Sequence, residues 1–219
     1  MKRLIRLLQR LPAGLWLYWG FLAGLLVMFA LLAEEVVERD AIGLDRVILD
    51  SLDRWRTPGL DLVAGILNVV GGSYVLAPLT VIVFVLLWRR RSRSAVFVGL
   101  AVFGAMALSG LAKLVFERPR PQAFEALVHA EGFSFPSGHA MGSTAVALAA
   151  YFSVRALAPA WRWPALAIGA AFALAVGVSR SYLLVHYPSD VIAGWILATA
   201  WVLGVHAAYS VGTNEQARA

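Results

Sequence analysis

The stretch SRSYLLVHYPSD, residues 179–190, separates two apolar segments and guides the interpretation of the whole chain. It places Arg180, His186 and Asp190 close together in a sequence that is 60% hydrophobic and only 15% charged. Ionisable residues at the mouth of a membrane bundle are energetically expensive, and by default they serve a function. The stretch therefore indicates a functional site at one end of a helical membrane protein.

The composition of the chain supports a membrane location. A soluble domain of 219 residues would be about half apolar and about a quarter charged, whereas the apolar excess here lies in long runs. We therefore expect one integral membrane domain over residues 1–219, with a motif core at residues 113–190. The net charge of +6 comes from basic residues that flank apolar runs, which indicates membrane orientation and no nucleic-acid partner. Cysteine is absent, which excludes disulfides, a thiolate nucleophile and a cysteine-based metal site.

Six apolar segments are candidates for transmembrane helices, because about 20 helical residues cross about 30 Å of hydrocarbon. Gly71-Gly72 and Pro78 should bend or interrupt the second segment, and the short fifth helix should continue towards Leu184. The sequence thus predicts an all-α membrane protein with six transmembrane helices. The segments are residues 14–33, 62–88, 95–116, 139–156, 164–178 and 191–209.

The basic residues sort onto one side of this six-span topology. They cluster at residues 2–10, 89–93 and 155–162, which precede the first span and connect the second to the third and the fourth to the fifth. The positive-inside rule makes this side, with both termini, cytoplasmic. The polar motifs then lie at the periplasmic or extracellular side of the cell membrane.

Residues 36–60, between the first two spans, mix charged and apolar side chains. An amphipathic helix on the outer membrane surface fits this pattern, and a solvated connecting loop is the alternative. The apolar face of the helix would hold Ile42, Leu44, Val47, Ile48, Leu52 and Trp55, opposite Asp45, Asp50, Asp53 and Arg54.

Two cations near the end of the third span are placed to face one phosphoryl group. Lys113 lies at the helix end, where snorkelling towards lipid headgroups is an alternative role. Arg120 precedes Pro121, which disfavours a helical conformation for Arg120 and places it on a rigid loop. Arginine suits bidentate contact with phosphate oxygens, and lysine acts as a point charge. Arg118 competes with Arg120 for this role.

The tetrapeptide Pro136-Ser137-Gly138-His139 opens the fourth span. Serine is a preferred N-cap, and glycine permits close approach of the backbone to a ligand. A helix N-terminus offers unpaired N–H groups to an anion, and His139 in the first turn would point at the same anion. A helix start with an incidental histidine is the alternative.

The spacing of four between His186 and Asp190 permits a carboxylate–imidazole hydrogen bond. Such a bond fixes the tautomer of the ring and leaves its other nitrogen free to attack. A metal site is poorly supported, because only His129 and His206 remain as further histidines and cysteine is absent.

Together, Lys113-x6-Arg120-Pro121, Pro136-Ser-Gly-His139 and Ser179-Arg180-x5-His186-x3-Asp190 resemble the type 2 phosphatidic acid phosphatase superfamily. This superfamily includes vanadium-dependent haloperoxidases, with which its members share a helical core. Within the superfamily, the chain most resembles bacterial lipid phosphatases of the phosphatidylglycerophosphatase B and undecaprenyl diphosphate phosphatase type, by its size and by the sequence FSFPSGH at residues 133–139.

The resemblance implies a mechanism through a phosphohistidine. His186 would attack phosphorus, Asp190 would orient its ring, and His139 would protonate the leaving oxygen and then activate water. The residues implied to bind phosphate are Lys113, Arg120, Ser137, Gly138 and Arg180. Neither a metal nor another cofactor would be required, because the fixed cations take the place of magnesium.

The expected function is hydrolysis of lipid phosphate monoesters or diphosphates at the outer face of the membrane. Undecaprenyl diphosphate, phosphatidylglycerol phosphate and phosphatidate are candidate substrates. A phosphotransferase of the same superfamily is the main alternative, and a transporter or channel is a distant one, because conduction favours charges spread along the spans. The sequence leaves the oligomeric state open.

Overall fold

The structure, a computed structural model, describes residues 13–38, 42–122 and 125–216, which form helices joined by loops. Five of these helices are long and apolar enough to cross a membrane, and the pair α4–α5 makes a sixth span if it is counted as one. The predicted all-α membrane architecture is therefore confirmed. The elements are α2 (Ala13–Glu38), α3 (Ile42–Arg54), α4 (Pro58–Val70), α5 (Ser73–Arg89), α6 (Ser94–Phe116), α7 (Gly138–Leu157), the short 3-10 helix η1 (Pro159–Trp161), α8 (Arg162–Tyr182) and α9 (Pro188–Gln216).

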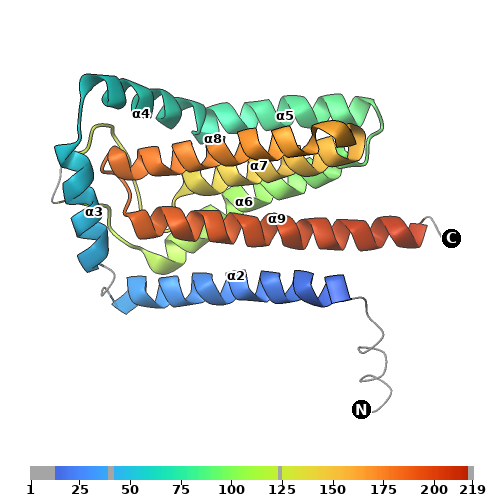
Figure 1. The fold of residues 1–219 in the computed structure, drawn as a ribbon, viewed down its shortest axis with the longest axis horizontal. Helices are drawn as coiled ribbons and strands as arrows, with labels where there is room; N and C mark the ends of the chain where they lie inside the picture. Colours follow the sequence, from blue (N-terminus) through green and yellow to red (C-terminus); the bar gives the residue numbers. More distant parts are fainter. Residues whose placement is uncertain (1–12, 39–41, 123–124, 217–219) are drawn as a thin grey trace, which may run out of the picture.

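The helices α6, α7, α8 and α9 run side by side, and α2 lies along α9 (Figure 1). Small residues at the contacts let their backbones approach closely, which is how membrane helices associate when lipid offers no hydrophobic driving force. The hydroxyl of Tyr18 donates to the carbonyl oxygen of Leu203 and ties α2 to α9. The main cluster of buried side chains comprises Phe97, Val98, Ala101, Val102, Ala105, Ala145, Ala149 and Val202.

Two tryptophans of α9 pack on glycines of neighbouring helices in the same way. A Cβ atom on Gly177 of α8 would lie 2.4 Å from Cζ2 of Trp195, and one on Gly104 of α6 would lie 2.3 Å from Cζ2 of Trp201. Each indole N–H donates to a main-chain carbonyl of the helix it faces, at 3.2 Å for Trp195 and 3.1 Å for Trp201. Glycine at these two positions sets the distance between α9 and its neighbours.

The junction between α4 and α5 interrupts the second predicted span. The two helices meet at an angle of 44° across Gly71 and Gly72, as the glycine pair predicts. A Cβ on Gly71 would lie 2.4 Å from Val176 of α8, so the backbone here packs directly against that helix. Pro78 lies inside α5, which continues past it, so the interruption of this span lies at the glycine pair.

The connection between the first two spans contains a helix, α3, as one of the two predicted alternatives has it, but one residue of this helix departs from its predicted face. Asp45, assigned to the charged outer face, is only 3% exposed, because Arg118 and Ser189 bind its carboxylate. Leu44 on α3 and Trp55 just after it, both assigned to the apolar face, are each 73% exposed, as side chains that face a membrane surface would be. Hydrophobic periodicity could not show that a buried ion pair with Arg118 turns Asp45 towards the bundle.

The predicted motifs gather at one end of the bundle. At this end α6 and α8 finish, α7 and α9 begin, and α3 lies across them (Figure 1). The start of α2 and the end of α9 lie at the opposite end. The α6–α7 and α8–α9 loops are therefore neighbours, and the bent pair α4–α5 borders them on a third side.

Candidate active site

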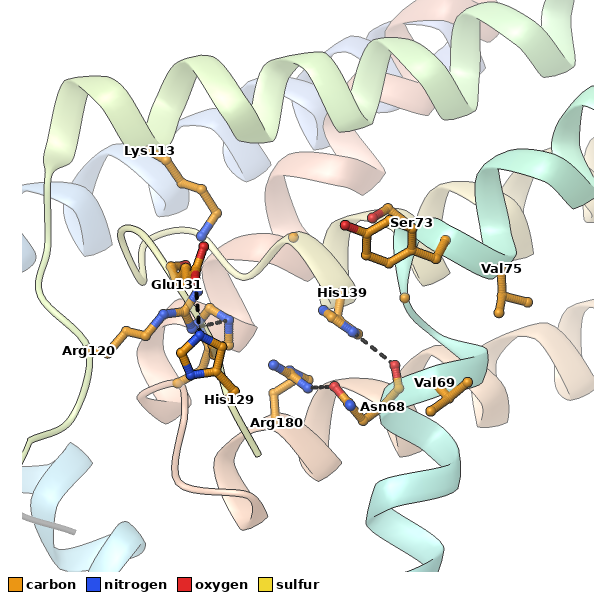
Figure 2. Close-up of a pocket in the computed structure, with 15 residues that line it drawn as sticks. Asn68, Val69, Ser73, Val75, Lys113, Arg120, His129, Glu131, His139 and Arg180 are labelled. Atoms are coloured by element: carbon orange, nitrogen blue, oxygen red, sulfur yellow. Dashed lines mark hydrogen bonds and ion pairs between the residues drawn. The ribbon is translucent and has the colours of Figure 1, made fainter. Parts of the chain in front are cut away.

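A cavity of about 410 Å³ opens among these loops and helix ends. In Figure 2, Lys113, Arg120 and Arg180 reach towards it from α6, from the α6–α7 loop and from α8. Three cations from three elements thus face one space. The residues that line the cavity are Asn68, Val69, Gly72, Ser73, Tyr74, Val75, Lys113, Arg120, His129, Ala130, Glu131, Gly138, His139, Arg180 and His186.

His186 and Asp190 form the contact that their spacing predicts. Nδ1 of His186 lies 3.3 Å from Oδ2 of Asp190, and both side chains are buried. Asp190 lies in the first turn of α9, which begins at Pro188, a residue suited to the first helical position. The main-chain N–H of Tyr187 donates to the same carboxylate oxygen at 2.9 Å, which fixes that oxygen beside the ring.

The partners of the His186 ring determine its tautomer. A carboxylate accepts, so Nδ1 carries the proton, and a guanidinium only donates, so Nε2 accepts from Nη1 of Arg120 at 3.2 Å. Burial, followed by the positive charges of Arg180 and Arg120, holds the pKa of His186 well below its ordinary value of 6.5. The imidazole is therefore neutral, and its Nε2 lone pair is suited to nucleophilic attack.

Arg120 is held in place by main-chain carbonyls on both sides of the cavity. Its Nη1 donates to Val185 at 2.8 Å, its Nε to Gly132 at 3.0 Å and its Nη2 to Glu131 at 2.8 Å. Burial lowers the pKa of this guanidinium, and the negative charge of Asp190 opposes that effect. The side chain is thus preorganised beside His186 before any ligand binds.

Asn68, at the end of α4, contacts two of the predicted site residues. Its main-chain carbonyl lies 3.0 Å from Nε2 of His139, and its side-chain oxygen accepts from Nη1 of Arg180 (Figure 2). A carbonyl only accepts, so Nε2 of His139 carries the proton of that ring. The bent pair α4–α5 therefore positions a proton donor and a cation at the same wall of the cavity.

At the start of α7, the main-chain N–H of Ser137 has a hydrogen-bond partner and its hydroxyl has none among the described residues. The N–H of Ser137 donates to the carbonyl oxygen of Asp190 at 3.0 Å, so this amide serves to join α7 to α9. The hydroxyl of Ser137 and Nε of Arg180 are buried and have no hydrogen-bond partner among the described residues. Buried polar groups are normally paired, so Nε of Arg180, whose side chain lines the cavity, is available to a bound ligand.

A second cavity, of about 250 Å³, adjoins the first between α5, α6 and α7. The two cavities share Ser73, Lys113, Gly138 and His139, and the main-chain carbonyl of Phe133 accepts a hydrogen bond from Lys113 Nζ. The remaining lining consists mostly of apolar or small residues of the spans. These are Gly71, Leu76, Met106, Ser109, Gly110 and Gly142.

The structure separates the two arginines on either side of Pro119. Arg120 lines the cavity, whereas Arg118 is only 7% exposed and pairs with Asp45 and Asp190 behind it. The sequence left Arg118 and Arg120 as competitors for one role, and in the structure Arg120 alone of the two faces the cavity.

Nine of the cavity residues lie outside the motifs, among them Asn68, Tyr74, His129 and Glu131, which sequence reasoning did not assign to the site. Asn68 had one signal, a polar side chain within an apolar run beside two glycines. Tyr74 is 95% exposed at the cavity rim, and His129 and Glu131 form an exposed pair there at 3.0 Å. Within the described ranges, no group of three or more histidine and carboxylate side chains is placed to hold a metal ion.

Comparisons with known proteins place these features in a wider context. A family model described as the PAP2 superfamily matches residues 94–213, a range that contains every predicted site residue. The chain is 34% identical to phosphatidylglycerophosphatase B of Bacillus subtilis (strain 168) over 177 residues, which cover 79% of this chain and 87% of that protein. It is 30% identical to an undecaprenyl-diphosphatase of Sulfolobus acidocaldarius, over 62% of this chain and 64% of that protein.

The fold of the chain also matches a solved structure. The crystal structure of a transmembrane PAP2 type phosphatidylglycerolphosphate phosphatase from Bacillus subtilis matches with a TM-score of 0.78 at 30% sequence identity. The match covers 89% of this chain and 96% of that chain.

Proposed function

The chain belongs to the PAP2 superfamily, and we propose that it is a membrane lipid phosphatase that hydrolyses phosphate monoesters or diphosphates of lipids. One observation carries the proposal: the unprotonated Nε2 of His186 faces a cavity that Lys113, Arg120 and Arg180 surround with positive charge. A phosphoryl group fits this combination of nucleophile and cations, since both its charge and its electrophilic centre are matched.

The proposed reaction has two steps. Nε2 of His186 forms a bond to phosphorus while the ester or anhydride oxygen leaves, and Asp190 balances the charge that develops on the imidazolium. His139 takes a second proton, at Nδ1, when the phosphate dianion binds, and it gives its Nε2 proton to the leaving oxygen, which takes the place of the Asn68 carbonyl; a neutral ring remains. His139 then removes a proton from water, the resulting hydroxide attacks phosphorus, and phosphate leaves as His186 is restored.

The cations, Ser137 and Gly138 hold the charge of the transferring phosphoryl group in this proposal. Fixed positive charges in a site shielded from water stabilise such charge strongly, so the steps need no metal ion. Ser137 contributes through its unpartnered hydroxyl, because its N–H is already committed to Asp190.

The adjoining cavity supports a lipid as the substrate. Its apolar lining begins at Lys113 and His139, where the phosphate would end, and continues between α5, α6 and α7. An amphiphile can therefore place its charged head among the cations and the first part of its chain between helices. Prenyl diphosphates such as undecaprenyl diphosphate, phosphatidylglycerol phosphate and phosphatidate all have this chemistry.

We place the cavity at the outer face of the cell membrane, with both termini in the cytoplasm. The arginine-rich connection at residues 89–93 and the basic residues at 155–162 lie at the end of the bundle away from the cavity. The positive-inside rule favours the cytoplasm for that end.

Phosphate release by the purified protein in detergent tests the function. Prenyl diphosphates, glycerophospholipid phosphates and soluble phosphate esters should be compared with EDTA present, and a lipid should be the best substrate. His186→Gln should lower kcat by at least about a thousandfold, since the nucleophile is lost. His206→Gln, a histidine at the other end of the bundle that stacks on Phe152 at 4.0 Å, is the control. Phosphate release by His186→Gln at the parent rate would refute the mechanism.

A further inference from the structure

We propose that Asp45 and Arg118 are positioning residues for the reaction, and that the extramembrane helix α3 acts on the nucleophile through them. The inference rests on the proposed function, because it concerns how His186 is held for attack. Asp45 lies outside the matched family segment and outside every sequence motif.

Arg118 joins two buried carboxylates. Its Nη1 donates to Oδ1 of Asp190 at 2.6 Å, and its Nη2 donates to Oδ2 of Asp45 at 2.8 Å. The guanidinium also lies over the Tyr187 ring, 4.1 Å from the centroid, which restricts it further. Asp45, Arg118 and Asp190 are 3%, 7% and 0% exposed, so solvent does not screen these contacts.

Ser189 closes the network on the side of α9. Its hydroxyl donates to Oδ2 of Asp45 at 2.6 Å and accepts from Nη1 of Arg118 at 2.7 Å, and its N–H donates to Oδ1 of Asp45 at 2.9 Å. Both oxygens of Asp45 are therefore bound. The carboxylate is fixed to the first turn of α9, directly before Asp190.

The two oxygens of Asp190 have different tasks as a result. Oδ1 binds Arg118, which leaves Oδ2 for Nδ1 of His186 and the N–H of Tyr187. An arginine fork free of other partners binds a carboxylate with two parallel hydrogen bonds. Asp45 occupies the second arm of the Arg118 fork, and this keeps Arg118 from taking the oxygen that orients His186.

The arrangement requires a negative charge at Asp45. A buried carboxylate or guanidinium that loses one partner is left uncompensated, and it rearranges to recover one. Without the negative charge of Asp45, Arg118 would turn its fork fully towards Asp190. The imidazole would then lose its fixed tautomer and direction, while the phosphate-facing cations, which do not contact Asp45, would remain in place.

The matched pair Asp45→Asn and Asp53→Asn tests the inference. Both residues lie on α3, but Asp53 is exposed and forms an ion pair with Arg56 at 3.2 Å. For a soluble aryl phosphate in detergent, Asp45→Asn should lower kcat about tenfold with little change in KM, because His186 loses its fixed direction while the phosphate-binding cations stay in place. Arg118→Lys keeps the positive charge but loses the two-armed guanidinium, and it should lower kcat by a similar factor. Asp53→Asn should match the parent.

A second readout does not depend on turnover. Diethyl pyrocarbonate modifies neutral imidazoles, and mass spectrometry can compare His186 with the exposed His129 in the same sample. Asp45→Asn should slow modification of His186 several-fold relative to His129, whereas Asp53→Asn should not. If the parent hydrolyses no phosphate ester, the proposed function fails, and the His186 modification rate still decides the role of Asp45.

A purely structural role for Asp45 predicts a different outcome. The thermal unfolding midpoint of Asp45→Asn would then fall, while kcat per folded molecule and the modification rate of His186 would equal those of the parent. That result would overturn the inference, and α3 would be only an anchor of the bundle.

Discussion

At the scale of single residues, the chemistry of His186 depends on what each of its ring nitrogens faces. Asp190 binds Nδ1 and Arg120 contacts Nε2. The spacing of four made the first contact predictable from the sequence. The second was not, because spacing alone cannot tell which arginine beside Pro119 turns towards the cavity. Arg118 is held away from the cavity by Asp45, Ser189 and Asp190, and Asp45 is distant in sequence from the site.

The acid limb of the pH profile tests the electrostatics of His186. Attack requires the neutral ring, so activity falls as the pH drops through the pKa of His186, which burial, Arg180, Arg120, Lys113 and His139 all lower. Arg180→Gln removes one positive neighbour, so the pKa of His186 should rise and the acid limb of kcat/KM should move to higher pH. The same change should lower kcat/KM about a hundredfold, because a phosphate-binding cation is lost.

Arg155→Gln, in the last turn of α7 at the other end of the bundle, is the matched control for this measurement. It should leave both the position of the acid limb and the value of kcat/KM unchanged. An unmoved limb in Arg180→Gln would mean that the protonation of His186 does not control the acid side of the profile.

At the scale of helices, hydrophobic runs predicted the spans well, since a membrane helix is defined by its length and polarity. The glycine pair at residues 71–72 also marked the α4–α5 junction correctly. The outward position predicted for Asp45 on α3 was wrong. Local pattern cannot show whether neighbouring elements supply a tertiary partner, and a single buried ion pair turned Asp45 inward.

The packing of tryptophan on glycine between α8 and α9 gives a prediction about stability. Gly177→Ala would place a methyl group 2.4 Å from the Trp195 ring, so α9 must shift, which should lower the free energy of unfolding by about 1–3 kcal/mol. Thermal unfolding in detergent measures the change. Adding Trp195→Phe, which shortens the ring system, should recover part of it.

The control for this prediction is Gly110→Ala in α6, where no atom lies within 4 Å of the added Cβ. Alanine favours helix over glycine, so this variant should equal or exceed the parent in stability. If Gly177→Ala and Gly110→Ala behaved alike, the tryptophan contact would not set the helix separation.

At the scale of the whole molecule, the chain has polar chemistry at one end and arginine-rich connections at the other. Residues 89–93 join α5 to α6 at the end away from the cavity. Charge counting along the sequence predicted this separation, because the side of each loop alternates with every span. The sequence could not predict how the motif loops meet, since that depends on the packing of four helices.

Single cysteines test the orientation, because the natural chain has none. Glu131→Cys places a thiol at the exposed cavity rim, and Arg90→Cys places one in the connection between α5 and α6. A membrane-impermeant maleimide added to intact cells should label Glu131→Cys alone. Arg90→Cys should react only after the membrane is permeabilised, and the reverse pattern would contradict a cavity on the outer side.

The three cations around the cavity have a consequence for how the protein behaves in solution. Folding brings Lys113, Arg120 and Arg180 together against their mutual repulsion, so an oxyanion that enters relieves it. Inorganic phosphate at about 100 times its Kd should stabilise the fold by about 2.7 kcal/mol, visible as a higher Tm, while chloride at equal ionic strength should not. Equal melting curves in the two salts would contradict this. Phosphate, the end product of turnover, should thus stabilise the folded protein during purification. As phosphate accumulates in a reaction, it should also inhibit the enzyme.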